Sequence, residues 1–479
     1  MARSTVTLGL VCAPPASAAE LGDNWVTPNS GGTELQAGSS DASACAGNPE
    51  IRERLASSGK LIVAGERVRD NLLRRFYVAH CYQTIWENYP AEAHSLWSAV
   101  LRAGEHGLDP RLLHAAVLND PGSSLSPIQR DLLLSDAFLS YADALARGVL
   151  PIEERMDDED LTPEPVDIVG LLDAAIATPD PAKLIEALAP SSVEYATMRR
   201  AYVEYRAIAD AGNQTHARNR KVPEFGQEGG RATAERRARQ LAINLERLRW
   251  LPRHIPPDRV VVNSAIARLQ LFRNDGPVFT TRVVVGEIDK QTPELQSTIN
   301  DVLFNPPWNI PRSIAQKEIL PKLTADPDYL SRHHMRWRSG GSLQQEAGPY
   351  SALGRLKFEM ADRYDVYLHD TPQKSLFLSA ERMMSHGCVR VENPRALAQL
   401  LLNQSAEAVD RGIALGYTNR RALPAPLPIF IVYQTAYVEA DGSVQFHSDP
   451  YERDDEVWQH LTPSKQAVAE DVTASQRKR

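Results

Sequence analysis

The sequence lacks the marks of several large classes of protein. Its 53 Lys and Arg residues are outnumbered by 61 Asp and Glu residues, so the net charge is −8. Binding to nucleic acid requires basic residues concentrated on one face, and this charge argues against DNA or RNA as a partner. Beyond the N-terminus, no apolar run is long enough to span a bilayer. The composition, with 43% hydrophobic and 24% charged residues, is that of a folded globular protein.

The N-terminus has the pattern of an export signal. Arg3 is followed by a short apolar stretch over residues 5–13 and by small residues at 16–19. We therefore predict a signal peptide over residues 1–19 and secretion across the inner membrane into the periplasm. The alternative is a disordered Ala-rich leader. Cys12 follows a bulky apolar residue, which argues against its modification by lipid.

Cysteine is scarce, and signal cleavage would leave only Cys45, Cys81 and Cys388. In an oxidising compartment, two of the three can pair. Cys45 and Cys81 lie in the same N-terminal region, so we predict a disulfide between them. Cys388 would then be the single free thiol of the exported chain, and its presence requires a chemical reason.

Length and hydrophobic periodicity predict an α+β protein of several domains. Apolar residues recur at helical spacing in the first half, and β-branched residues alternate from Arg259 onward. The first half should form an α-helical scaffold domain and the second a mainly β domain. The expected boundaries are a disordered leader over 20–48, the helical domain over 49–211, a linker over 212–232, the β-rich domain over 233–458 and a disordered tail over 459–479.

The β-rich part contains a hairpin and an insertion. Alternating stretches over residues 260–272 and 279–285 flank Asn274, Asp275 and Gly276, which are typical of a hairpin turn. Residues 309–352 interrupt the strand pattern with a helical patch, a Gly-Gly pair and basic and aromatic residues, and we interpret them as a lid. Further strands are expected over residues 302–304, 356–360, 366–369 and 429–438.

Cys388 and His369 are the side chains best suited to catalysis. Cys388 lies beside Arg390 and shortly before Asn393-Pro394, a favourable helix start, and both features favour the thiolate. His369 ends a predicted strand before the turn at Pro372. An imidazole close to a thiol can take its proton and return it to an amine, as cysteine acyl transfer requires. From the residues alone, a buried structural thiol is the alternative.

The spacing of these residues resembles the signature of the L,D-transpeptidases of the YkuD type. That signature is a His followed, after fifteen intervening residues, by Ser385-His386-Gly387-Cys388, an aliphatic residue and Arg390. The chain is also similar to the long YcbB-type branch of this family. The stretches that carry this second resemblance include 243–249, 283–286, 298–300, 305–311, 353–355 and 368–372.

The resemblance implies a sandwich-like catalytic domain and a defined reaction in peptidoglycan synthesis. Cys388 would attack the meso-diaminopimelate carbonyl in the tetrapeptide stem of a donor strand, release D-Ala and form a thioester. The side-chain amine of a diaminopimelate in an acceptor stem would convert the thioester into a 3→3 cross-link, with His369 as the base. The implied partners are these stem peptides and other cell-wall synthesis proteins, and the same thiol would react with carbapenems.

The resemblance also implies supporting roles near the nucleophile. Backbone N–H groups around Gly387 and Cys388 would form the oxyanion hole, and the main chain near Asp370 would orient the base. Ser385 and His386 are interpreted as residues that hold the loop by hydrogen bonds, rather than as proton carriers. Arg390 would orient the loop or a substrate carboxylate.

Four residues are candidates for the substrate groove, namely Tyr367, Trp308, Asn309 and Tyr350. The alternative for the aromatic residues is a place in the core. We expect no metal, because the spacing of the His and Cys residues is not that of a structural zinc site and thiolate chemistry needs none. We expect no other cofactor.

The chain departs from the family in one respect. The long branch usually carries a peptidoglycan-binding module where this chain has only residues 212–232, and its sequence pattern is missing here. Substrate capture would then depend on the groove, the lid or the helical domain. Two other functions stay open: an L,D-carboxypeptidase or cross-link hydrolase with the same Cys and His, and a non-catalytic scaffold that binds the cell wall.

Overall fold

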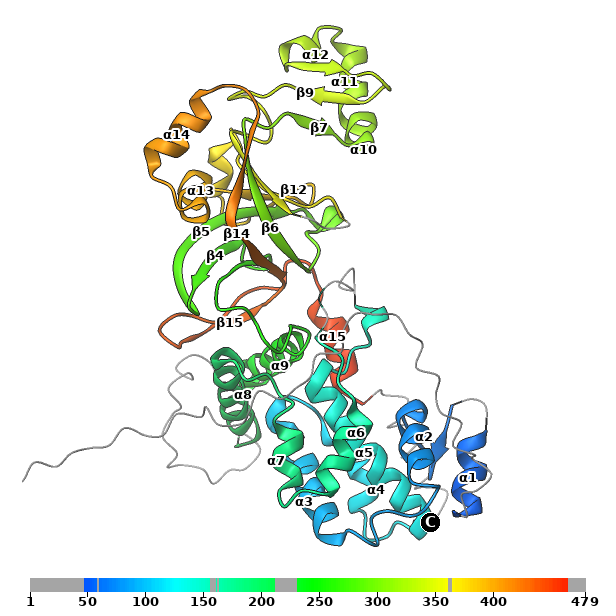
Figure 1. Ribbon diagram of the computed structural model, residues 1–479. Coiled ribbons are helices and arrows are strands. Elements are labelled where there is room, and N and C mark those ends of the chain that lie inside the picture. Colours follow the sequence, from blue (N-terminus) through cyan, green and yellow to red (C-terminus); the bar gives the residue numbers. More distant parts are fainter. Residues whose placement is uncertain are drawn as a thin grey trace, which may run out of the picture. The chain divides into compact units, whose positions relative to one another are not determined.

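The computed structural model describes residues 47–57, 60–155, 161, 163–211, 231–360 and 364–463 (Figure 1). The predicted signal peptide, nearly all of the predicted leader, most of the linker and the tail from residue 464 lie outside the described residues. In the part of the chain that is described, no helix is long and apolar enough to cross a membrane.

The first half of the described chain is helical, which confirms the prediction from periodicity. Its longest helix, α5 (Pro127–Arg147), begins where Ser126 and Gln129 form a capping box. Most of α5 is buried, and the other helices pack around it. These are α1 (Pro49–Ala56), α2 (Asp70–Ala79), α3 (Pro90–Leu101), α4 (Ala115–Asn119), α6 (Ile168–Ile176) and α7 (Pro181–Glu186), beside the hairpin of β1 (Ile62–Val63) and β2 (Glu66–Arg67).

Two later helices join this helical core. α9 (Arg231–Leu248) packs on α8 (Val193–Ala211), and Ile243 of α9 belongs to the same apolar cluster as α5. α15 (Asp454–Leu461) contributes Val457 to that cluster, so the chain returns to the helical part after the sheet (Figure 1). The β-rich domain as bounded from the sequence therefore includes two helices that pack with the helical domain.

The β-rich part is one nine-stranded sheet that closes on itself. The strand order is β12-β5-β13-β11-β10-β6-β14-β3-β4, and β5 also pairs with β4. Apolar side chains from alternate positions fill the interior, as strand geometry requires. The strands are β3 (Arg259–Asn263), β4 (Arg268–Arg273), β5 (Gly276–Gly286), β6 (Leu295–Phe304), β10 (Leu356–Met360), β11 (Leu368–His369), β12 (Met383–Ser385), β13 (Val389–Val391) and β14 (Asn419–Val432).

Smaller elements complete this part of the chain. Helices α13 (Pro394–Leu402) and α14 (Ala406–Ala414) contribute apolar side chains to the core of the sheet. The hairpin of β15 (Ala436–Val438) and β16 (Val444–Phe446) packs instead against α8 and α9, in a separate apolar cluster. The sheet and the helical domain are thereby connected through α9.

One predicted strand is wrong. The alternation over residues 260–272 predicts a single strand, but the structure has two, β3 and β4. The Asn263 side chain accepts the N–H two residues later at 3.2 Å, and Ala267 takes a φ of +48°, so the chain reverses there. The predicted hairpin turn between β4 and β5 is confirmed, because Asn274 and Asp275 have φ values of +49° and +62°.

A small unit with its own core lies within the predicted lid, residues 309–352. Its sheet has the order β7-β9-β8, and Ile310, Ala315, Ile319 and Leu343 are buried together beneath its helices. The elements are β7 (Trp308–Ile310), α10 (Arg312–Ile314), a π-helical turn (Ala315–Ile319), α11 (Leu320–Ala325), α12 (Tyr329–Arg332), β8 (Met335–Trp337) and β9 (Leu343–Gln345).

The cysteines of the described chain have different states. Cys81 is disulfide-bonded. Cys45 lies outside the described residues, so the pairing of these two cysteines stays a prediction. The Cys388 thiol is not part of a disulfide.

The buried Glu246 connects α9 to the end of α5. Its carboxylate accepts the Leu150 N–H at 3.0 Å and forms an ion pair with Arg249 at 2.8 Å, and both charged side chains are 0% exposed. A Cβ at Gly148 would lie 2.4 Å from the same carboxylate, so only glycine fits there. Such a pair holds as long as both members are present, because either charge alone would be buried without compensation.

We predict that Glu246→Ala lowers the free energy of unfolding by about 3–5 kcal/mol, since it leaves Arg249 buried and uncompensated. Denaturant unfolding of the full chain measures this loss. The control is Glu235→Ala on the same helix, which removes an exposed pair with Arg231 and should cost about 0.5 kcal/mol or less. Similar losses in both variants would contradict the assigned role of Glu246.

Candidate active site

The register of two short parallel strands brings the predicted catalytic residues together. β11 pairs with β13 so that Leu368 lies opposite Val389 and His369 lies opposite Arg390. The Val389 N–H donates to the Tyr367 carbonyl at 3.1 Å, which extends the register by one residue. Leu368 and Val389 are both 0% exposed and belong to the core of the sheet.

Alternation then decides which side chains share the other face. Because neighbouring residues in a strand point to opposite sides, Tyr367 and His369 leave the sheet on the face opposite Leu368. The rings of Tyr367 and His369 lie 5.7 Å apart. By the same argument, Cys388 and Arg390 leave β13 on that face, opposite the two rings. The predicted nucleophile, base and arginine thus share one side of the sheet with Tyr367.

His369 is held in one tautomer. Its Nδ1 lies 2.5 Å from the Asp370 carbonyl oxygen, which can only accept a hydrogen bond. Nδ1 must therefore carry the proton, and Nε2 is the basic nitrogen. The ring is 5% exposed, so packing fixes its orientation.

The surroundings keep the His369 imidazole neutral. Burial, reinforced by the positive charges of Arg390 and Lys357, lowers the pKa of His369 to about 3, although the bond to the Asp370 carbonyl acts in the opposite direction. Lys357 of β10 lies directly opposite His369 in the sheet. At neutral pH, the ring is therefore a proton acceptor rather than a cation.

The Cys388 thiol is half-buried between two partners. Its Sγ lies 3.8 Å from the Asp365 carbonyl oxygen. Burial, followed by the Cys388 charge, raises the pKa of Tyr367, and Trp308 acts on it in the opposite direction, so the Tyr367 hydroxyl lies near both residues. Tyr367, assigned from the sequence to the substrate groove, is thus a neighbour of Cys388, the predicted nucleophile. Trp308, the first residue of β7, lies near Tyr367.

Hydrogen bonds hold the loop that presents the nucleophile. The Ser385 hydroxyl donates to the Cys388 carbonyl at 2.6 Å and accepts the Gly387 N–H at 3.2 Å. Thr292 Oγ1 donates to the Gly387 carbonyl at 2.8 Å. Gly387 has a φ of +110°, which residues with a Cβ rarely adopt. The Gly387 N–H expected in the oxyanion hole is occupied by Ser385 in this conformation.

Arg390 is fixed beside the catalytic pair. Its guanidinium donates to Gln373 at 2.9 Å. Burial lowers the pKa of Arg390, while the negative charge of a Cys388 thiolate raises it. Arg390 therefore stabilises the thiolate and disfavours a charged imidazole on His369.

The Asp370 side chain fixes the backbone next to His369, the predicted base. Its carboxylate accepts the Arg355 N–H at 2.8 Å and the Thr371 N–H at 2.7 Å, and it pairs with Lys374 at 2.6 Å. A Cβ at Gly354 would lie 2.4 Å from this carboxylate, so the close approach requires glycine there. The carboxylate thus fixes the backbone whose carbonyl orients His369.

His386 connects the nucleophile loop to the lid. Its Nε2 lies 2.5 Å from the Glu318 carboxylate, and Lys290 lies 3.6 Å from the same carboxylate. Burial opposes ionisation of Glu318, but His386 and Lys290 together lower the pKa of this residue. Glu318 belongs to the π-helical turn of the lid, a local geometry that is frequent at functional sites.

The other groove candidates lie in or near the lid. Asn309 is exposed on β7 and accepts a hydrogen bond from Gln344 at 2.7 Å. Tyr350 is 45% exposed and stacks on His334, with ring centroids 3.6 Å apart. Neither contact involves the catalytic pair. Among the described residues, no group of three His, Cys, Asp or Glu side chains could hold a metal ion.

Sequence reasoning missed Thr292, Gln373, Lys357 and Glu318. They come from four distant segments, and none belongs to the motif around Cys388. Only pairing of β10 with β11 brings Lys357 to His369, and only the fold of the lid brings Glu318 to His386. No spacing in the sequence signals these contacts.

Two segments of the chain match known protein families, and one of them contains the residues of the candidate site. Residues 257–412 match the YkuD family, described as the L,D-transpeptidase catalytic domain. Residues 71–201 match a second family, described as the Scaffold domain. The chain carries an L,D-transpeptidase catalytic domain. The matched segment contains His369 and Cys388, and the Scaffold match lies in the helical domain.

Individual proteins similar to this chain have low to moderate sequence identity with it. A Haemophilus influenzae protein named provisionally as an L,D-transpeptidase is 33% identical over 242 residues, which are 46% of this chain and 48% of that protein. The chain therefore spans about half the length of this relative. An L,D-transpeptidase structure from Mycobacterium smegmatis has 13% identity over 36% of this chain and 58% of that one, with a TM-score of 0.21. A cysteine-to-serine mutant of the Enterococcus faecium L,D-transpeptidase has 9% identity over 48% and 82% of the two chains, with a TM-score of 0.18.

The lowered pKa of His369 predicts a specific acid sensitivity. The unfolded chain binds a proton at this residue below about pH 6.5, whereas the folded chain does so only near pH 3, so folding loses about 1.4 kcal/mol per pH unit between these values. His369→Gln removes the proton site, and its stability should fall less steeply with acid. Unfolding measured from pH 7 to pH 4 tests this, with exposed His94→Gln as the control. Parallel profiles for wild type and His369→Gln would rule out a depressed pKa.

The contact between His386 and Glu318 predicts that charge holds the lid in place. In Glu318→Gln, the lid segment 312–325 should exchange its amide hydrogens faster, because the carboxylate that meets His386 and Lys290 is lost. Hydrogen-exchange mass spectrometry measures this at neutral pH. Glu346→Gln, which removes an exposed lid pair with Arg336 at 3.4 Å, is the control and should change little. Equal exchange in the two variants would refute the role of Glu318.

Proposed function

We propose that the protein is a peptidoglycan L,D-transpeptidase that forms 3→3 cross-links between meso-diaminopimelate residues through a Cys388 thioester. The observation that carries this proposal is the placement of Cys388, Tyr367, His369 and Arg390 on one face of two paired strands inside the matched catalytic domain. The reaction would take place in the periplasm, after export, on the cell wall.

The first half-reaction follows from the geometry around Cys388. The thiol proton passes to Nε2 of neutral His369, and the sulfur attacks the donor carbonyl. Arg390 stabilises the thiolate, and the Tyr367 hydroxyl would donate a hydrogen bond to it. The C–N bond to D-Ala breaks as His369 returns the proton to the leaving amine, which leaves a thioester on Cys388.

The second half-reaction uses the same groups in reverse order. The amine of an acceptor diaminopimelate attacks the thioester carbon and gives a proton to His369. The C–S bond breaks, the thiolate recovers a proton and the new amide is the cross-link. Because the folded pKa of His369 is far below neutral pH, the ring is unprotonated at the start of each half-reaction, and any proton that it takes is readily given up again.

Water in place of the acceptor amine would make the protein a carboxypeptidase, and attack on an existing cross-link would make it a hydrolase. The four side chains are the same in each case, so the product decides. Trp308, directly before the lid, lies near Tyr367, and Glu318 of the lid contacts His386, so this segment is placed to exclude water from the thioester. This arrangement favours transfer.

The proposal predicts the products formed from a purified disaccharide-tetrapeptide. Wild-type protein should release D-Ala and yield cross-linked dimers, which mass spectrometry distinguishes from the tripeptide product of hydrolysis. Cys388→Ala should lose all product and should form no adduct with a carbapenem, because the attacking sulfur is gone. Cys81, which is disulfide-bonded, should carry no adduct in either protein. Tripeptide without dimers would replace transfer by hydrolysis, and product from Cys388→Ala would exclude the thioester.

A further inference from the structure

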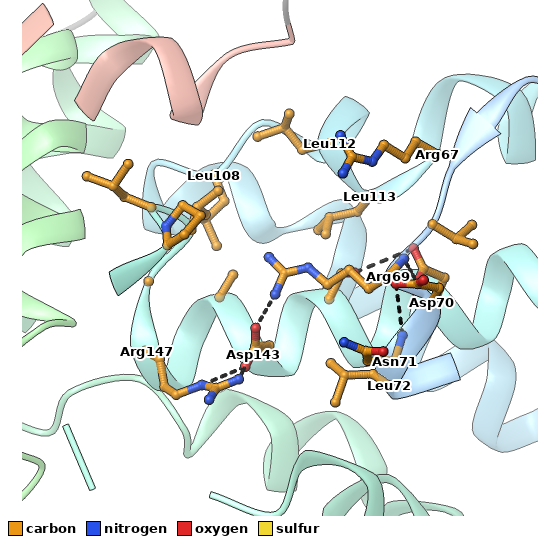
Figure 2. Close-up of a pocket in the computed structure, with 18 of the residues that line it drawn as sticks. Arg67, Arg69, Asp70, Asn71, Leu72, Leu108, Leu112, Leu113, Asp143 and Arg147 are labelled. Atoms are coloured by element: carbon orange, nitrogen blue, oxygen red, sulfur yellow. Dashed lines mark hydrogen bonds and ion pairs between the residues drawn. The ribbon is translucent and has the colours of Figure 1, made fainter. Parts of the chain in front are cut away.

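The helical domain contains a pocket that the proposed reaction does not use. Its volume is about 950 Å³, within the range of sites for small ligands. The walls come from β2, the start of α2, the turn before α4 and the C-terminal end of α5. Leu108, Leu112 and Leu113 form an apolar side of the pocket, and arginines face it (Figure 2).

Two of the arginines share one buried carboxylate. Arg69, just before α2, and Arg147, at the end of α5, both form ion pairs with Asp143, whose side chain is 6% exposed. The Nε of Arg147 also donates to this carboxylate at 2.8 Å. Figure 2 shows the two guanidinium groups meeting Asp143 from different elements. One negative charge against two positive charges leaves an excess of positive charge that the ion pairs hold in place.

Other charges increase this excess. Arg67 and Lys60 also line the pocket, are exposed, and have no acidic partner among the described residues. Of the remaining carboxylates in the lining, only Glu153 has no cation of its own outside the pocket. The others have cations outside the pocket: Asp70 pairs with Arg74, Asp109 pairs with Arg111, and Asp136 pairs with His114, which also pairs with Glu66. The pocket is therefore positive in a chain whose net charge is −8.

The backbone adds to the same field. The first turn of α2, residues 70–72, lines the pocket, and the N-terminal end of a helix carries a partial positive charge. The Arg69 N–H donates to Asp136 at 2.8 Å, which fixes the start of this helix against α5. Three independent features, the shared carboxylate, the unneutralised cations and the helix end, therefore favour an anion.

We propose that this pocket binds the carboxylates of a peptidoglycan stem peptide, and so anchors the protein to the polymer on which the catalytic domain acts. This inference rests on the proposed function. Guanidinium groups bind carboxylates in pairs of parallel hydrogen bonds, and the leucine side of the pocket suits the methyl groups of alanine in the stem. Residues 212–232 stand where the long branch usually carries a peptidoglycan-binding module, and this pocket would supply a contact of that kind.

The test uses the full chain with Cys388→Ala, so that the probe is not consumed. Binding of a purified disaccharide-tetrapeptide is measured by calorimetry, and binding of intact sacculi by sedimentation. Adding Arg67→Glu should weaken both by about fivefold or more, because it reverses a charge in the pocket. Arg67 is exposed and outside the core, so the variant should fold. Arg67→Lys should retain most of the affinity.

The matched control is Arg102→Glu, an exposed arginine elsewhere in the helical domain whose side chain, among the described residues, donates to the Ser98 carbonyl at 3.3 Å and to no acidic group. Its affinity should equal that of the parent protein. Equal loss in both charge reversals would mean non-specific attraction and would overturn the proposal, as would unchanged binding in Arg67→Glu. Competition by the disaccharide without its peptide would overturn the assignment to carboxylates.

Carbapenem acylation, measured on chains that retain Cys388, separates this proposal from the proposed function. Arg67→Glu should be acylated at the wild-type rate, because the pocket contributes nothing to the thiol. If the wild type is acylated but the charge reversal leaves binding intact, the pocket proposal fails and the catalytic one stands. If no chain is acylated while Arg67→Glu still weakens binding, the catalytic proposal fails and the pocket remains a stem-peptide site.

Discussion

The parallel register between β11 and β13 is the constraint on which the site depends. It is only two residue pairs long, yet it decides which side chains enter the core and which face the substrate. Leu368 and Val389 anchor it from the inside, and a shift by one residue would turn His369 toward the apolar core and Leu368 toward the opposite face of the sheet. The geometry of the candidate site is therefore specified by the packing of two apolar residues, Leu368 and Val389, that have no role in the proposed chemistry.

The charges of the site affect the thiol of Cys388 and the imidazole of His369 in opposite ways. The positive charge of Arg390 acts on both groups: it favours the thiolate of Cys388 and disfavours the imidazolium of His369. In the proposed reaction, the imidazolium formed on His369 would therefore be short-lived, and its proton would pass readily to a leaving amine. Asp370 does not offset this charge directly, because its carboxylate is occupied by Lys374 and by backbone N–H groups.

In this chain, patterns of consecutive residues predict helices, turns and loop motifs well. The helical first half, the hairpin turn at Asn274 and the motif around Cys388 are all visible in consecutive residues, because helix periodicity, turn chemistry and loop motifs are short-range properties. The break between β3 and β4 was missed, although Asn263 marks it, because the alternating pattern continues through the turn. Contacts such as that of Glu318 with His386 depend on how the lid folds, which no local spacing records.

The return of α15 to the helical core makes the scaffold a discontinuous domain. Its wall is built from chain segments that are synthesised before and after the whole catalytic sheet. The helical part therefore reaches its final packing only when nearly all of the described chain is present. The sheet lies between α9 and α15 in the sequence and is therefore an insertion within the helical domain. The two parts are not consecutive, independent units, and we expect their folding to be coupled.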